Sequence, residues 1–151
     1  MNSDKSIDIV GTQLSDINSK GVYRHVSAEG RHDMEETLAT LTEDCLFEDL
    51  GLGRTWYGRE GAREYYQLWW DAFGVVPETS TLYGVTPDQF VVELRFKGKH
   101  IGRFLGIEPT GKSIDLSMAL FVEMRDGKLT GERFYWNIAD LYRQLGVTKL
   151  H

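Results

Sequence analysis

Acid–base catalysis is the chemistry that the ionisable side chains of this sequence could support. The candidates are two histidines and two carboxylates, namely His25, Asp49, His100 and Glu132. In a dry pocket the pKa values of a carboxylate and an imidazole move toward each other, and proton shuttling needs such matched values. We therefore predict that these four catalytic candidates converge on one largely apolar pocket.

Three of the candidates also have an ordinary structural interpretation. Asp49 ends the short segment CLFED beside a glycine-rich loop, where an aspartate commonly caps a turn. A single histidine on a helix, such as His25, is usually exposed or hydrogen-bonded in place. His100 has the parity of Leu94 and Phe96 if that strand runs unbroken, and is otherwise a histidine on an edge strand. Both interpretations stay open at the level of the sequence.

The phase of one strand decides whether the carboxylate of Glu132 reaches the pocket. Glu132 shares its parity with Phe134 and Trp136, so it faces inward if those rings line the cavity. Burying a carboxylate among rings without a partner is costly. The opposite phase, with Glu132 in solvent and Arg133 inward, stays open.

A long hairpin between Ser113 and Asn137 must organise the sheet that positions these groups. Its first arm, SIDLSMALFVEM, has an apolar residue at every second position, which predicts a strand with one buried face. Asp126 and Gly127 supply the positive-φ residues of a tight turn, and the second arm is rich in aromatic residues. The side chains that we expect to face inward are Leu94, Phe96, Leu116, Met118, Leu120, Phe134 and Trp136.

The remaining pattern predicts helices first and strands afterwards. Helices are expected at about 16–29, at about 59–73 and in the segment IADLYRQL. A capping box at 33–36 opens a further short helix. Strands are expected near 45–49, 79–85, 90–96 and 99–105. This order predicts an α+β fold in which a curved antiparallel sheet wraps round the N-terminal helices to form a cone-shaped pocket. Residues 1–15 are expected to be a flexible arm, and residues 16–151 a single domain.

Composition narrows the classes of partner. The 151 residues carry a net charge of −6, and no basic stripe suggests nucleic acid as a partner. The single cysteine, Cys45, fits a reducing compartment, and no apolar run is long enough for a membrane span, so we expect a cytoplasmic protein that binds no membrane. No group of histidines, cysteines or carboxylates has metal-ligand spacing, and the segments GLG and GREG are not phosphate loops. We therefore predict neither a metal nor another cofactor.

Several segments resemble those of a known family. The stretches GKHIGRFLGIEPTGKSIDL and RDGKLTGERFYWNIADLYRQLG, together with GRHDMEETLATLTEDCLFED and GREGAREYY, are similar to the SnoaL-like polyketide cyclases of the nuclear-transport-factor-2-like superfamily. The resemblance covers roughly residues 22–146. It implies the cone-shaped fold more specifically than any one reaction, because members of this superfamily include cyclases, isomerases, dehydratases and epoxide hydrolases.

The segment TLTEDCLFEDLGLGRTWYGREGAREYY also resembles ketosteroid isomerase. This resemblance implies that Asp49 shuttles a proton, that His25 takes the place of an oxyanion-stabilising tyrosine, and that Tyr66 supports it. Trp136 matches an aromatic residue that flanks the pocket. Leu120 departs from the pattern, since an acid is found near this position in both families.

These observations together predict a cofactor-independent acid–base enzyme that acts on a small hydrophobic molecule, as an isomerase, dehydratase or cyclase. Leu120 favours the alternative, a non-catalytic module of the same fold that binds a hydrophobic ligand. Exposed rings at Phe121 and Tyr135 predict a homodimer through the convex face of the sheet. The side chains expected to contact substrate are Tyr66, Phe96, Leu120, Phe134 and Trp136.

Overall fold

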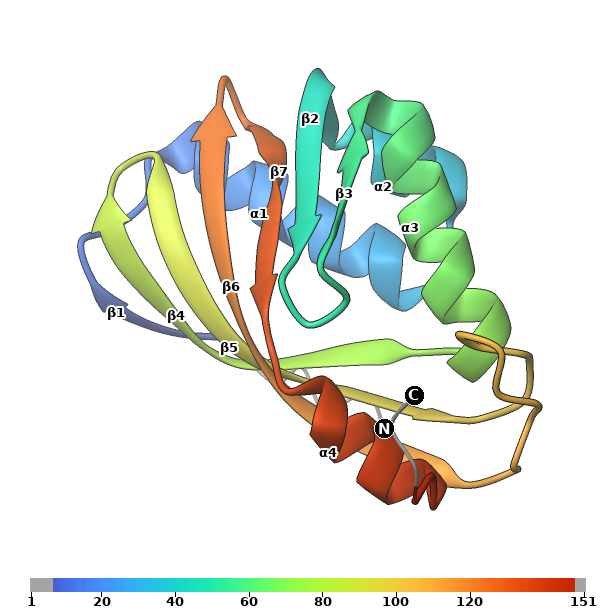
Figure 1. The fold of residues 1–151 in the computed structure, drawn as a ribbon. Helices are drawn as coiled ribbons and strands as arrows, with labels where there is room; N and C mark the ends of the chain where they lie inside the picture. Colours follow the sequence, from blue (N-terminus) through green and yellow to red (C-terminus); the bar gives the residue numbers. More distant parts are fainter. Residues whose placement is uncertain (1–6, 149–151) are drawn as a thin grey trace.

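A curved sheet with helices on its concave side forms the architecture of this chain (Figure 1). The computed structural model describes residues 7–148, and all counts below refer to those residues. The elements in chain order are β1 (Asp8–Gly11), α1 (Asp16–Gly30), α2 (Met34–Ala39), β2 (Leu41–Asp49), β3 (Arg54–Tyr57), α3 (Gly58–Phe73), β4 (Val76–Thr86), β5 (Gln89–Lys99), β6 (Ser113–Arg125), β7 (Lys128–Tyr135) and α4 (Ile138–Leu145).

The sheet has seven strands in the order β1-β4-β5-β6-β7-β2-β3. Most neighbours are antiparallel, as predicted, whereas β1 pairs with β4 and β2 pairs with β7 in parallel. Parallel pairing between β2 and β7 joins the N-terminal helical half of the chain to the C-terminal hairpin. The fold is therefore the expected α+β arrangement, and the same β2–β7 ladder carries two of the candidate acids.

The alternation predicted for the long hairpin is confirmed. In β6 the apolar residues at even positions are buried, and the turn at Asp126 and Gly127 has φ values of 52° and 78°. Two positive φ values match the twist of the flanking strands in a two-residue hairpin turn. The residues predicted to face inward are buried, apart from Trp136, which is half-buried.

A bulge at Gly131 sets the phase of β7. Val122 pairs with Glu132, but Met124 pairs with Leu129, so β7 carries one more residue than β6 between these points. The extra residue lets both Leu129 and Glu132 face inward although their parities differ. Gly131 has φ 134°, and an added Cβ would lie 1.8 Å from the carbonyl oxygen of Leu46, so only glycine fits there.

Helix α3 supplies the aromatic side of the core. Its residues Tyr65, Tyr66, Trp69 and Phe73 are buried against the sheet, and Gly74 ends the helix in the left-handed conformation. No helix within residues 7–148 is both long enough and apolar enough to cross a membrane.

Three segments differ from the sequence-based expectation. Residues 8–11 of the predicted arm form β1, and residues 54–57 of the predicted loop form β3. The first six residues of that arm lie outside the described part. The predicted strand at 99–105 is instead an irregular segment after β5, where Leu105 and Gly106 have positive φ and Phe104 bridges Ile107. Because the alternation of apolar residues is lost there, period-2 reasoning had little to follow.

Candidate functional site

His25 lies on α1, which packs closely on the β6–β7 turn. Ser15 caps the helix by accepting a hydrogen bond from the backbone N–H of Asn18. A Cβ added to Gly21 would lie 2.0 Å from the carbonyl oxygen of Gly127, so this glycine permits the close approach of helix and sheet. One helical turn further on, the imidazole of His25 reaches the inward face of β7.

The two ring nitrogens of His25 have different partners. Nδ1 lies 2.7 Å from the hydroxyl oxygen of Thr40, and that hydroxyl donates its own hydrogen to the carbonyl oxygen of Thr37 at 2.5 Å. Because the Thr40 hydrogen is already used, Nδ1–H must be the donor and Thr40 the acceptor. This contact fixes the ring orientation and directs Nε2 toward the sheet.

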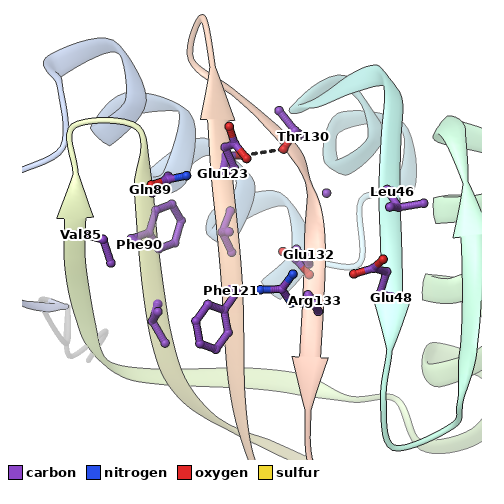
Figure 2. A pocket seen from close by; sticks show the side chains of 13 residues that line it. Leu46, Glu48, Val85, Gln89, Phe90, Phe121, Glu123, Thr130, Glu132 and Arg133 are labelled. Atoms are coloured by element: carbon purple, nitrogen blue, oxygen red, sulfur yellow. Dashed lines mark hydrogen bonds between the residues drawn. The ribbon is translucent and has the colours of Figure 1, made fainter.

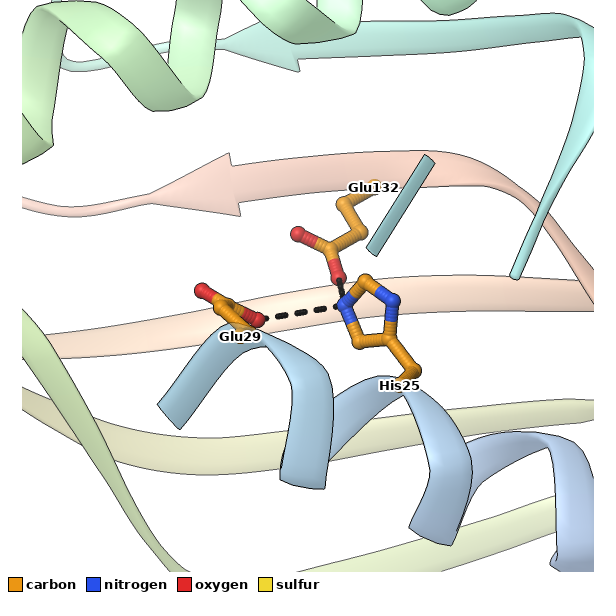
Figure 3. Close-up of side chains that lie close together, drawn as sticks. All are labelled: His25, Glu29 and Glu132. Carbon is orange, nitrogen blue, oxygen red and sulfur yellow. Dashed lines mark ion pairs between the residues drawn. The ribbon is translucent and has the colours of Figure 1, made fainter. Parts of the chain in front are cut away.

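Two carboxylates surround Nε2 (Figure 3). The distance from Nε2 to Oε2 of Glu29 is 3.1 Å, and the distance to Oε1 of Glu132 is also 3.1 Å. Glu29 lies one turn after His25 on α1, whereas Glu132 comes from β7. All three side chains are buried. We call His25, Glu29 and Glu132 the His–Glu–Glu cluster.

Burial and the two carboxylates act in opposite directions on the imidazole. Burial lowers the pKa of His25, but the hydrogen bonds and charges of Glu132 and Glu29 outweigh it and raise the pKa from 6.5 to about 10. Burial has the opposite effect on the carboxylate of Glu132, whose pKa it raises, and the neighbouring imidazolium partly offsets this rise. His25 is therefore a cation at neutral pH in the metal-free protein.

The cluster forms part of the wall of a small cavity between α1 and the sheet. Its volume is about 40 Å³, and apolar side chains of β4, β5 and β6 make up most of the remaining wall. Phe96 and Leu120, both predicted to contact substrate, line it together with His25 and Glu132. Leu120 faces inward on this wall, and its match to the position of the family acid stays a prediction from the resemblance.

Asp49 is buried in a separate polar centre at the end of β2. Its Oδ2 accepts a hydrogen bond from the Tyr65 hydroxyl at 2.7 Å, and its Oδ1 accepts from the indole N–H of Trp136 at 2.7 Å and the backbone N–H of Leu52 at 2.8 Å. Burial raises the pKa of Asp49, although these three donors oppose the shift. The carboxylate thus joins the loop after β2, α3 and the end of the hairpin.

The two polar centres are close in the sheet but separated by rings. In the β2–β7 ladder Glu132 pairs with Phe47, and Asp49 pairs with Phe134. Two residues along a strand correspond to about 7 Å. The rings of Phe47 and Phe134 are 6.2 Å apart and belong to the buried core between the centres.

His100 lies just beyond β5, next to Phe73 at the C-terminal end of α3. Its Nδ1 accepts a hydrogen bond from the backbone N–H of Thr110 at 3.1 Å, and its ring stacks on Phe73 with centroids 5.0 Å apart. Its Nε2 is buried and has no hydrogen-bond partner among the described residues.

The predicted convergence therefore holds for His25 and Glu132 only. Within residues 7–148 the structure does not place Asp49 or His100 on the wall of the cavity, and their catalytic roles stay predictions. Strand parity did not place His100, because the strand ends at Lys99. The phase left open for β7 is settled, since Glu132 is buried and Arg133 is exposed.

The other three residues predicted to contact substrate pack in or against the hydrophobic core, outside the cavity wall. Tyr66 is buried with its hydroxyl oxygen 3.4 Å from Nε2 of His25, and Phe134 is buried against Tyr65 with ring centroids 4.9 Å apart. Trp136 covers Gly51, where an added Cβ would lie 2.2 Å from the indole. None of these three belongs to the cavity wall as the described residues form it.

Sequence analysis missed two members of this arrangement. Glu29 follows His25 at i+4 on a helix, and that spacing brings two side chains together on one face, so the pattern carried a usable signal. Thr40 had no such signal, because its contact with His25 depends on how α2 packs against α1.

The outer face of the sheet has a groove of about 340 Å³ (Figure 2). Phe121 and Tyr135, exposed at 44% and 40%, pack edge to face with centroids 5.4 Å apart. The Arg133 guanidinium lies 5.2 Å from the Phe121 ring centroid, and Glu48 and Glu123 also line the groove. The face therefore combines exposed rings with both signs of charge.

Solved structures of several bacterial proteins share this fold. A candidate SnoaL-like polyketide cyclase from Jannaschia sp. CCS1 superposes with a TM-score of 0.78 and 19% identity, covering 91% of this chain and 96% of that one. A candidate polyketide cyclase from Xanthomonas campestris pv. campestris has a TM-score of 0.72 and 22% identity, covering 85% and 96%. A candidate isomerase from Bacillus subtilis has a TM-score of 0.70 and 18% identity, covering 90% and 97%. Among curated proteins, no sequence match is found.

The family resemblance of the sequence is confirmed independently of these superpositions. The model of the SnoaL-like polyketide cyclase family matches residues 21–145, which include most of α1, the whole His–Glu–Glu cluster and the long hairpin. The chain therefore belongs to the SnoaL-like polyketide cyclase family.

Proposed function

We propose that this protein is an acid–base enzyme that acts on a small hydrophobic molecule, by isomerisation, dehydration or cyclisation. One observation carries the proposal: the imidazole of His25 is held between the carboxylates of Glu29 and Glu132, 3.1 Å from each, at the wall of an otherwise largely apolar cavity. Burial raises the pKa of Glu132, which makes its carboxylate a stronger base, and the adjacent imidazolium can stabilise negative charge that develops on a bound molecule.

The cluster suggests a role for each member. Glu132 acts as the base that removes a proton from a carbon next to a carbonyl group. The imidazolium of His25 donates its Nε2 hydrogen bond to the oxygen on which negative charge develops. Glu29 keeps His25 protonated through the same contact that raises the histidine pKa. This assignment moves the base from Asp49 to Glu132, because the Asp49 carboxylate already accepts three hydrogen bonds.

The cavity limits the size of the substrate. Ligand pockets commonly have volumes of about 300–1,000 Å³, whereas this cavity has about 40 Å³. Binding of any organic molecule must therefore displace apolar side chains of the wall. The same apolar wall supports the alternative function, a non-catalytic module that binds a hydrophobic ligand.

Deuterium exchange tests the proposal without knowledge of the natural substrate. The protein is incubated in D₂O with a panel of small apolar ketones and lactones, and mass spectrometry follows deuterium uptake next to the carbonyl group. Glu132→Gln and His25→Gln should each lower the exchange rate by about 10²–10⁴. Glu123→Gln, on the outer face of the adjacent strand, is the matched control and should exchange as the wild type does. Panel ligands that bind without any exchange would support the binding module instead.

Assembly and location belong to the same proposal. The exposed rings and mixed charges of the outer face support a homodimer through the sheet. The cytoplasmic location, and the absence of nucleic-acid or membrane partners, stay predictions from composition.

A further inference from the structure

The His–Glu–Glu cluster has the form of a metal-binding site. Nε2 of His25, Oε2 of Glu29 and Oε1 of Glu132 are atoms of metal-ligating groups, and the ligand atoms of the three residues lie within 4.8 Å of one another. Two of the side chains come from consecutive turns of α1 and the third from β7, and all point to one centre (Figure 3). The sequence showed no metal-ligand spacing because the third ligand is far away along the chain.

The distances at Nε2 match those between ligand atoms of a metal ion as well as those of long hydrogen bonds. Hydrogen bonds between an imidazolium and a carboxylate are usually about 2.7–2.9 Å long, whereas both distances at Nε2 are 3.1 Å. A single Nε2 hydrogen can serve both oxygens only as a bifurcated hydrogen bond, which points directly at neither of them. Neighbouring ligand atoms bound at about 2.0–2.2 Å to a divalent ion lie about 2.8–3.6 Å apart, depending on whether the angle between them is octahedral or tetrahedral.

The surroundings of His25 match those of metal-binding histidines. Such histidines donate their other ring N–H to an oxygen, which fixes the ring orientation. Nδ1 of His25 donates to Thr40, which in turn donates to the carbonyl oxygen of Thr37. Nε2 is thereby directed at the two carboxylates.

The charge balance of the cluster favours a divalent cation. Among residues 7–148 no lysine or arginine forms an ion pair with Glu29 or Glu132, so His25 is the cation between them. Two ionised carboxylates, a neutral imidazole and a divalent ion would together be electrically neutral. Buried charges persist when they are paired or coordinate a metal.

A buried hydroxyl points to a further ligand at this centre. Tyr66 is 3% exposed, and its hydroxyl oxygen lies 3.4 Å from Nε2 of His25. A protonated Nε2 offers no lone pair to that hydroxyl, which leaves it without an acceptor at this nitrogen. The adjoining cavity of about 40 Å³, which His25, Glu29 and Glu132 help to line, has room for a water molecule that could complete a coordination shell.

We propose that His25, Glu29 and Glu132 bind one divalent transition-metal ion in place of the Nε2 proton. One imidazole and two carboxylates suit Zn²⁺, Mn²⁺ or Fe²⁺ better than the oxygen-only cations. The proposal does not rest on the acid–base function. The mechanism proposed above is that of the metal-free protein, because a bound ion would replace the Nε2 proton and occupy the carboxylate of Glu132.

Titration calorimetry with Zn²⁺ and Mn²⁺ tests the site directly. The protein is first treated with EDTA and dialysed, and the expected result is binding of one equivalent of at least one of the two ions. Glu132→Gln and Glu29→Gln should each weaken that binding by more than about 100-fold, because loss of an outer-shell partner alone costs 10–100-fold. Glu123→Gln and His32→Gln are the matched controls, and both should bind as the wild type does.

A measurement on the wild type covers the case in which a cluster variant does not fold. Nitrogen NMR of the histidine rings should show that the metal ion shifts Nε2 of His25 and leaves Nδ1 bonded to Thr40. No binding to the wild type, unchanged binding in folded Glu132→Gln, or an unshifted His25 signal at saturation would each overturn the proposal. Metal binding without deuterium exchange would support the metal site and refute the proposed enzyme. Deuterium exchange without metal binding would support the enzyme and refute the metal site.

Discussion

The buried imidazolium makes a specific prediction about stability as a function of pH. The partners that face His25 are Glu29 on α1, Glu132 on β7, Thr40 at the end of α2 and Tyr66 on α3. In the folded, metal-free protein the pKa of His25 is raised from 6.5 to about 10, chiefly because the two carboxylates outweigh burial. The folded chain therefore binds one more proton than the unfolded chain between these pH values.

The sign and size of the effect follow from proton linkage. Because the folded pKa is the higher one, the stabilisation is fully present below pH 6.5 and is lost as the pH rises through about 10. Each pH unit within this range lowers the free energy of unfolding by about 1.4 kcal/mol. Between pH 7 and 8.5 the expected loss is about 2 kcal/mol. The thiol of Cys45, whose pKa burial raises from 9.0 to about 11, adds to the loss only near the top of this window.

Urea denaturation at several pH values, in the presence of EDTA, measures this loss. The midpoint should fall steadily from pH 7 to 8.5 in the wild type and stay almost constant in His25→Gln. Should that variant fail to fold, an NMR titration of His25 in the wild type gives the pKa directly. A flat wild-type profile, or a His25 signal that titrates near pH 6.5, would refute the reasoning.

Four further predictions concern stability and assembly. Asp49→Ala leaves one buried and two half-buried donors without an acceptor, so denaturation should show a loss of roughly 3 kcal/mol, and an unchanged midpoint would contradict the network. Thr40→Val removes the acceptor of Nδ1 and should lower the NMR-measured pKa of His25, whereas Thr40→Ser should preserve it. Gly131→Ala should cost about 2–4 kcal/mol, against little at the uncrowded Gly30, and equal effects would refute the bulge argument. Sedimentation should show a dimer at micromolar concentration that Phe121→Ser weakens, and a wild-type monomer would end that proposal.

Local pattern alone determined most of the secondary structure. The alternation from Ile114 to Met124 specified a buried face because side chains on a strand point to opposite sides in turn, and Asp126-Gly127 specified the turn because it needs positive φ. The same local rules located α3, which ends at Phe73 as predicted. The family resemblance then supplied the way these elements curve around a pocket.

Contacts between distant segments decided the site. Parity left Glu132 ambiguous, and its inward position depends on the bulge at Gly131, which no local period encodes. Asp49 and His25 both proved to be buried, but the packing of Phe47 and Phe134 keeps them in separate centres.

Glu29 separates what the sequence pattern predicts from what tertiary packing decides. Its spacing from His25 is written in the sequence, because residues four apart on a helix share a face. Its importance is not, because that depends on Glu132 reaching the same nitrogen from β7. The sequence by itself determined which elements form and which faces they bury, since these follow from backbone geometry and apolar periodicity. Only the tertiary structure decided which buried acids share one histidine, because close packing of α1 on the sheet sets those distances.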